Sequence, residues 1–288
     1  MATSTAPPSD GLDPNQRLLV ALGDRGCLAD VRAAVGAGAN VNLRCGRSGA
    51  GPTALHVAIV SNRADVSALL IGHGADLDAR DDDGRTALIL AAHYRRDAIA
   101  HQILDCGMDA VVGARDGMDR TPLMYAAGSG LIGVAIRLLD GGAEMDACDR
   151  NGVTALVYAG MGGHRALMRH LLERGANPEV RDSNGRTILI QTAGFVGDPS
   201  PFFRLLLGHG ADSAAVDARG RGLPETLIAT HNLDGLAGLD GLLAQPSLVD
   251  ARKRLLARLT ETQAAAWLPA CLSVEAAARV RPGWQRHI

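Results

Sequence analysis

Lysine and aromatic residues are scarce in this chain of 288 residues, and both shortages narrow the classes of protein that it can be. Only Lys253 is a lysine among the 29 basic residues, a bias typical of GC-rich coding such as that of many bacteria. The formal net charge of −2 gives no overall positive field to attract nucleic acid or an anionic membrane. Aromatic residues make up 3% of the sequence and hydrophobic residues 47%, so we expect a core of Ala and Leu in closely packed helices.

The chain also lacks the patterns of a disulfide framework, a zinc site, a secretory signal and a membrane span. The cysteines are odd in number and show no C-x-x-C spacing: Cys27, Cys45, Cys106, Cys148 and Cys271. The N-terminus has no basic region followed by an apolar run, and no apolar run reaches about 18 residues. These observations predict a cytoplasmic protein that keeps its thiols reduced.

Motifs for catalysis and for cofactors are weak. Gly128 to Gly133 matches G-x-G-x-x-G, but a dinucleotide fingerprint must follow a strand, whereas this segment follows a predicted helix over 122–127. The run Asp81 to Gly84 is predicted to be a hairpin tip rather than a calcium loop. We therefore predict no enzyme, no cofactor, no metal and no small-molecule substrate.

What the chain does contain is an internal repeat. The pattern Thr-x-Leu returns at intervals of 33, 35, 33 and 33 residues, starting at Thr53, Thr86, Thr121, Thr154 and Thr187. A second marker, Gly followed by Ala or Met and then Asp, Asn or Glu, keeps the same interval from Gly38 to Gly210. A fixed period of this length indicates stacked units that bury their apolar faces against their neighbours.

One period is explained by local chemistry. Asp149 to Gly152 predicts a tight hairpin tip, and Thr154 stands where the N-cap of a helix belongs. A short helix over 155–159, a glycine-rich break and a second helix over 165–172 follow, and Gly175 ends the unit in a position that favours a left-handed backbone.

These markers resemble the ankyrin repeat pattern D-x-x-G-x-T-P-L-H-x-A-A followed by G-A-D/N, from about Arg17 to Arg221. The resemblance implies an all-α fold of about six stacked helix-turn-helix repeats with hairpin-like loops. It also implies protein binding without catalysis. The family's His survives only as His56, so no Thr–His hydrogen-bond network is expected between repeats. Asp119 replaces the turn glycine of one unit, and extra residues near 113–115 and within 195–201 predict surface loops.

The resemblance divides the chain into three parts. Residues 1–14 are small and polar and are expected to be a disordered tail, residues 15–221 form the repeat array, and residues 222–288 read as helical but lose the period. A repeat array needs an atypical cap, which 222–288 would supply. The alternative is a partner-binding tail carrying Trp267 and Trp284; an enzyme in this segment is disfavoured because it holds no His/Asp/Cys cluster.

Side chains that a repeat does not need for itself are the candidate binding residues, on the concave face and hairpin tips. Arg85, Arg120, Arg186 and Arg221 share one repeat position and would form a row for an acidic partner, whereas Tyr125 and Tyr158 are expected in the core. Arg80 and Arg181 are further candidates at the hairpin tips. The predicted partner-binding set is Arg85, His93, Tyr94, Met118, Arg120, Ser129, Met161, Arg186, Phe195 and Arg221. The partner is predicted to be one or more proteins, and not nucleic acid or membrane; an immunity or inhibitor subunit, or a host-directed effector, would use the same surface.

Overall fold

The structure is a computed structural model that describes residues 11–23, 26–45, 51–194 and 199–229. It divides into two compact units, Met1–Glu144 and Met145–Ile288, each treated by itself below. The predictions made for Phe195, Trp267 and Trp284, and for the tail over 1–10, lie outside the described residues.

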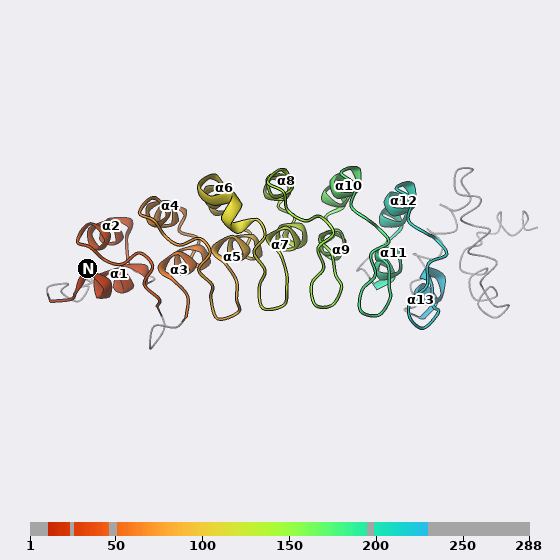
Figure 1. Cartoon of the computed structure of the whole chain (residues 1–288), viewed down its shortest axis with the longest axis horizontal. Helices are drawn as coiled ribbons and strands as arrows, with labels where there is room; N and C mark the ends of the chain where they lie inside the picture. The colour runs from red at the N-terminus through yellow and green to blue at the C-terminus, as the bar shows by residue number, and fades with distance from the viewer. Residues whose placement is uncertain (1–10, 24–25, 46–50, 195–198, 230–288) are drawn as a thin grey trace, which may run out of the picture. The chain divides into compact units, whose positions relative to one another are not determined.

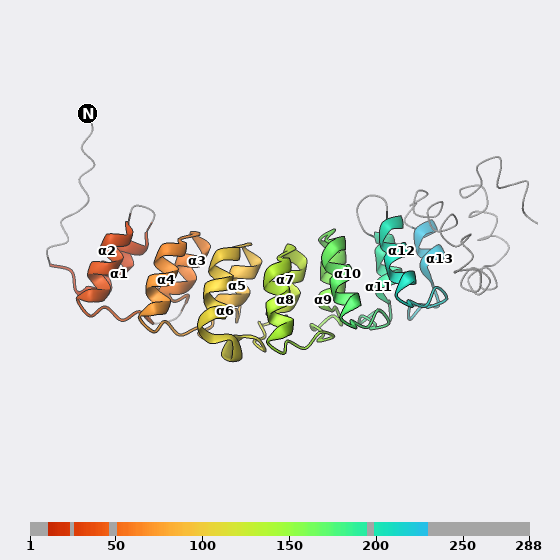
Figure 2. The ribbon, with the colours of Figure 1, turned by 90° about the horizontal axis from the view of Figure 1, so that it is seen from above.

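Unit 1 is a stack of helix pairs in two layers (Figure 1). Each pair has an inner helix, which follows the hairpin-like loop, and an outer helix that lies over it (Figure 2). The inner helices are α1 (Pro14–Leu22), α3 (Ala54–Val60), α5 (Ala87–His93) and α7 (Pro122–Ser129), and the outer helices are α2 (Leu28–Gly36), α4 (Ala64–Gly72), α6 (Asp97–Val111) and α8 (Ile132–Asp140).

Unit 2 repeats the same arrangement. The inner layer has α9 (Ala155–Met161), α11 (Ile188–Gln191) with the 3-10 turn η2 (Thr192–Gly194), and α13 (Leu223–Ala229). The outer layer has α10 (Arg165–Glu173) and α12 (Ser200–Gly208). The predicted all-α stack of helix-turn-helix units is confirmed; within the described residues the β-bridge between Arg44 and Thr53 is isolated and extends into no strand.

The core is built from small aliphatic side chains, as the composition predicts. In α5 the residues Ala87, Leu88, Ile89, Ala91 and Ala92 are completely buried. Alanine brings neighbouring helices close together, and the leucines fill the remaining space at the density of a protein interior. Aromatic residues are therefore not needed for packing in this helix.

The repeated threonine is the N-cap of α3, α5, α7, α9 and α11, and its hydroxyl has a different environment from repeat to repeat. Thr121 accepts a hydrogen bond from the Met124 N–H (3.3 Å), as an N-cap should. Thr53 instead bonds His56, whose other ring nitrogen lies 3.2 Å from the Arg85 carbonyl oxygen in the next repeat. The Thr–His link that we did not expect is therefore present at His56, and it joins two repeats.

The chain is helical just before the first predicted insertion and at the end of the second. Helix α6 continues to Val111, and Gly107 within it has an extended φ of −162°, whereas Gly175 in the matching position has φ +95°. The extra residues before 113–115 therefore form an added helical turn. Ser200 and Pro201, expected in a loop, form the first turn of α12. Proline is tolerated there because the N–H groups of a first turn have no acceptor within the helix.

Helix α1 begins inside the segment expected to be a tail. Asp13 is its N-cap, and the Asp13 carboxylate accepts a hydrogen bond from the Gln16 N–H (2.9 Å) while the Gln16 side chain accepts one from the Asp13 N–H. This reciprocal capping box starts the first helix pair at Pro14. At the other end, α13 is the described part of the predicted cap over 222–288.

Candidate protein-binding surface

An aspartate bonds the backbone of each hairpin tip over 81–85, 116–120, 149–153, 182–186 and 217–221, and in all of these but the first it is buried. In the tip that precedes α7, the Asp116 carboxylate accepts hydrogen bonds from the N–H groups of Met118 (2.8 Å) and Arg120 (2.9 Å) and pairs with the Arg120 guanidinium (2.8 Å). Burial opposes charge on Asp116, but hydrogen bonds from Tyr125 and from the tip outweigh it and lower the pKa of Asp116 below its ordinary value. The aspartate is therefore a charged acceptor that fixes the tip.

This arrangement occupies the arginines that we predicted to form a row for an acidic partner. The guanidinium of each one pairs with the aspartate four residues earlier: Arg85 with Asp81, Arg120 with Asp116, Arg186 with Asp182 and Arg221 with Asp217. These four arginines are therefore not free cations, because each one stabilises its own hairpin. The sequence signal was present as Asp-x-x-x-Arg at every one of these tips.

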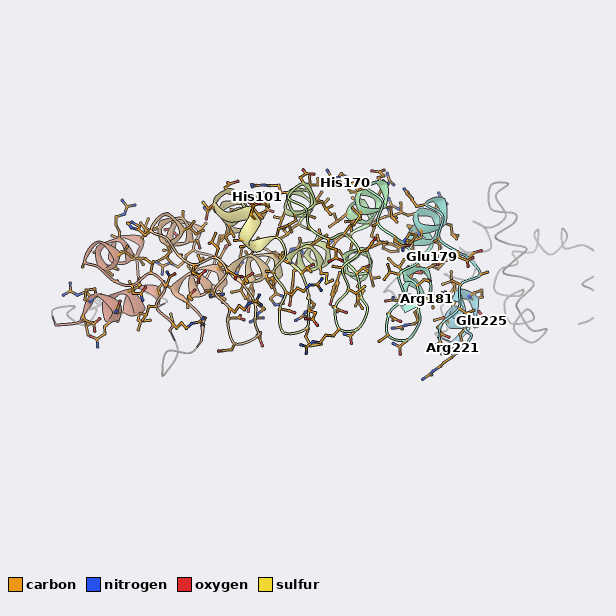
Figure 3. All side chains as sticks on the ribbon, viewed as in Figure 1. His101, His170, Glu179, Arg181, Arg221 and Glu225 are labelled. Carbon is orange, nitrogen blue, oxygen red and sulfur yellow. The ribbon has the colours of Figure 1, made fainter. Side chains whose placement is uncertain are left out.

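Arg80 and Arg181, the two further candidates at the hairpin tips, bridge successive hairpins. Arg181, labelled in Figure 3, donates to the carbonyl oxygens of Gly185 (2.7 Å) in its own hairpin and of Val216 (2.5 Å) in the next. Arg80 makes the same two kinds of contact, to Gly84 and to Arg115. These side chains therefore tie successive hairpins together, and they are exposed at the same time.

A hollow of about 320 Å³ lies between α3 and the hairpin tip over 81–85. Its apolar lining comes from Pro52, Val57, Val60 and Leu90, and its polar lining comes from the tip and from His56 and Ser61. Three aspartates and one arginine make the tip acidic, and Asp82 and Asp83 are exposed. This hollow is larger than any single amino-acid side chain, and negative charge lies at its edge.

An aromatic cluster lies at the end of α5. The His93 ring meets the edges of Tyr94 (centroids 4.9 Å apart) and Tyr125 (5.5 Å). The Arg120 guanidinium lies 4.9 Å from the centre of the Tyr125 ring, a cation–π distance. Partial burial lowers the pKa of His93, and the charges of Arg85 and Arg120 lower it further.

Tyr125 and Tyr158 were expected in the core, and this is wrong. Both are half-buried, because each hydroxyl reaches out to donate to the aspartate of its own hairpin, Asp116 (2.7 Å) and Asp149 (2.8 Å). Burial, together with the bond to Asp116, raises the pKa of Tyr125 far above its ordinary range. Neither tyrosine could be placed from helical periodicity, because the periodicity does not show that the hairpin folds back over the helix.

The other predicted residues differ in exposure. Tyr94 (38%) and Met118 (40%) in unit 1 and Met161 (63%) in unit 2 expose apolar surface, as does Val60, which lines the hollow. Ser129 is half-buried at the end of α7. We call the hollow together with Tyr94, His93, Met118 and Tyr125 the inner surface of unit 1.

Two negative findings concern the described residues alone. Nowhere in them do three or more His, Cys, Asp or Glu side chains gather so as to hold a metal ion. No helix in the same ranges combines the length and the apolar composition that crossing a membrane would require.

Stacked helix pairs joined by hairpins define the class: a helical repeat protein whose units contact their neighbours. A family model for ankyrin repeats (three copies) matches residues 18–116 and again residues 123–217. The chain therefore belongs to the ankyrin repeat family. That family is generally a non-enzymatic interaction module, and the matches below are consistent with a role in protein–protein interaction.

Curated proteins match part of the array. Human ankyrin repeat and SOCS box protein 6 is 34% identical over 111 residues, covering 35% of this chain and 26% of that protein. The mouse nuclear factor NF-κB p105 subunit is 38% identical over 98 residues, or 34% of this chain and 10% of the relative. Zebrafish (Danio rerio) neurogenic locus notch homolog protein 1 is 35% identical over 111 residues, covering 38% of this chain and 4% of the relative. The matched segments are thus small fractions of much longer proteins.

A solved structure covers more of the chain. The ankyrin repeat domain of Bcl-3, a member of the IκB protein family, aligns with 77% of this chain and with all of that domain. The TM-score is 0.61 and the sequence identity is 25%. The family and the helical repeat architecture are thus supported by sequence and by structure.

Proposed function

We propose that this chain is a non-catalytic module that binds a protein partner through the inner surface of unit 1. The observation that carries the proposal is that unit 1 has both exposed apolar side chains, Tyr94 and Met118, and an apolar hollow of about 320 Å³. Aromatic residues and Met are enriched where proteins bind one another, and a tyrosine beside a pocket is a frequent source of binding energy. The NF-κB and IκB names among the similar proteins support a binding role.

The negative charge beside the hollow indicates which kind of partner segment would bind there. The tip over 81–85 carries three carboxylates and one guanidinium, and Arg85 is already paired with Asp81 (2.9 Å) and Asp83 (2.6 Å). Asp82 is exposed at this tip. The surface therefore suits a segment that inserts one apolar side chain into the hollow and places a lysine or arginine next to the tip.

The experiment compares partners captured from a cell extract by the wild-type chain and by Tyr94→Ala/Met118→Ala. The captured protein is then purified and its Kd measured for both. Removal of a buried tyrosine contact costs about 2 kcal/mol, so we expect the variant to bind about thirtyfold more weakly. Asp82→Asn should weaken binding less and reduce its salt dependence.

The matched control is Ile132→Ala, because Ile132 is as exposed (40%) as Met118 but begins the outer helix α8. Equal affinity of wild type and the double variant, with both folded, would refute the inner surface of unit 1 as the docking site. Met161→Ala asks separately whether the same partner reaches unit 2, where Arg186, Arg221 and Phe195 also remain predictions.

A further inference from the structure

A groove of about 680 Å³ lies on the outer helices of unit 2, away from any hairpin tip. Helices α10 and α12 lie side by side there, as Figures 1 and 2 both show. Arg165 and Arg169 line the groove from α10, and Arg204 lines it from α12. All three are exposed, and Glu173 is the one acidic residue in the lining.

No ion pair within the described residues engages these three arginines, and all three line the same groove. By contrast, Arg85, Arg120, Arg186 and Arg221 each pair with an aspartate of their hairpin, and on the outer helices of unit 1 Arg137 pairs with Asp105 (2.6 Å). Three guanidinium groups therefore face one carboxylate in the groove of unit 2. Such an excess of positive charge in a concave surface attracts an anionic ligand.

His209 adds a polar group to the same groove. Its Nδ1 lies 2.8 Å from the Leu205 carbonyl oxygen, which can only accept, so Nδ1 carries the proton in this contact. The other ring nitrogen, Nε2, can then only accept in the neutral ring, so it suits a backbone N–H group of a bound segment. Leu205, Pro201 and Gly208 supply apolar surface between the charges.

The spacing of the charges indicates the form of the anion. Arg165 and Arg169 are four residues apart on one helix, so they project from the same face about 6 Å apart along the axis. In an extended peptide, every second residue points the same way at a repeat of about 6.6 Å. Carboxylates at alternate positions of an extended chain would therefore match the two arginines of α10, while Arg204 meets the chain from the other wall.

We propose that the α10–α12 groove binds an extended acidic segment of a protein, with Asp or Glu at alternate positions. This site is separate from the inner surface of unit 1 and carries the opposite charge. The arginines recognise carboxylates by charge-assisted hydrogen bonds, which a guanidinium makes in pairs.

The test titrates the full chain, at low and at high salt, against a short fluorescein-labelled peptide of alternating Glu and Gly. The arginine variant is Arg169→Gln/Arg204→Gln. The control Arg32→Gln/Arg219→Gln removes the same charge from exposed positions on α2 and on a hairpin tip. We expect the arginine variant to bind about tenfold more weakly and the control to bind as the wild type does, because exposed ion pairs contribute modestly and add up.

A gain-of-binding variant makes the test independent of folding defects. Glu173→Gln removes the opposing carboxylate, so it should tighten binding several-fold, and Tyr94→Ala/Met118→Ala should leave it unchanged. Equal weakening by the arginine and control variants would show attraction by net charge alone and overturn the proposal. Absence of saturable peptide binding at low salt would also overturn it, as would tighter binding of single-stranded RNA or anionic vesicles through the same arginines.

Discussion

A glycine-to-alanine substitution, which adds one methyl group, can test how closely neighbouring hairpins approach each other. Gly152 has φ +76°, and a Cβ placed on it would lie 2.8 Å from the Asp182 Cα and 2.9 Å from the Arg181 carbonyl oxygen of the next hairpin. Gly175 has φ +95°, yet nothing lies within 4 Å of its Cβ position. Both glycines belong to unit 2, so Gly152→Ala and Gly175→Ala differ chiefly in the close approach of a second hairpin.

The expected magnitudes follow from these distances. A left-handed alanine costs about 1 kcal/mol at either position. Non-bonded carbon atoms sit about 3.5–4.0 Å apart, so Gly152→Ala must also push the hairpins apart by roughly 1 Å. That shift would stretch the hydrogen bond from the Ser183 N–H to the Asn151 carbonyl oxygen (2.8 Å) beyond its useful range. Overpacking of this kind costs about 2 kcal/mol more, so we expect a total near 3 kcal/mol for Gly152→Ala.

Urea unfolding followed by far-ultraviolet circular dichroism measures both losses. Gly152→Ala should lower the unfolding free energy by about 2 kcal/mol more than Gly175→Ala does. Equal losses would mean that backbone strain alone accounts for the glycine, and that the contact between hairpins contributes nothing to the stack. A smaller loss for Gly152→Ala would contradict the geometry outright.

Two other predictions concern buried polar groups. Thr86 carries a buried hydroxyl without a partner, whereas the Thr53 hydroxyl bonds His56 (2.8 Å). In urea unfolding, Thr86→Val should therefore be neutral or stabilising, and Thr53→Val should lower the unfolding free energy by about 1 kcal/mol. The same loss in both variants would refute the distinction. The lowered pKa of Asp116 means that its charge stabilises the fold above the ordinary value of 3.8, and that this contribution is lost as the pH falls through the lower folded value. Unfolding at a series of pH values should therefore show the stability gap between wild type and Asp116→Asn shrinking below about pH 4, while exposed Asp82→Asn stays close to wild type throughout.

The repeat period was sufficient to predict the stack, the helix pairs and the N-cap position of each threonine. It was sufficient because the same residues stand at the hairpin, N-cap and helix-end positions of successive units, so each unit gives the same prediction independently. Where one unit departs, the prediction was weaker. The residues added before 113–115 could have formed a loop or a helical turn, and only the backbone of Gly107, with its extended φ, shows that α6 kinks and then continues.

The binding surface was predicted less well, for a physical reason. Sequence position identifies which side chains a repeat does not bury, but not which of them bond to the next repeat. Arg80 and Arg181 looked free because their partners are backbone carbonyl oxygens about 35 residues away, which carry no residue signature. Tyr94 and Met118 were exposed as expected, and their role in binding stays a prediction.

The two proposed surfaces follow from one distinction among the charged residues. A charge that recurs at each period is explained by the period: the arginines at 85, 120, 186 and 221 each neutralise the aspartate that fixes their hairpin. A charge that appears in one unit without a partner has no such explanation. Arg165, Arg169 and Arg204 in the outer groove belong to this second kind, as does the exposed carboxylate of Asp82 beside the hollow. Because an unpaired charge contributes little to the stability of a stack, binding of a partner explains these residues better than folding does.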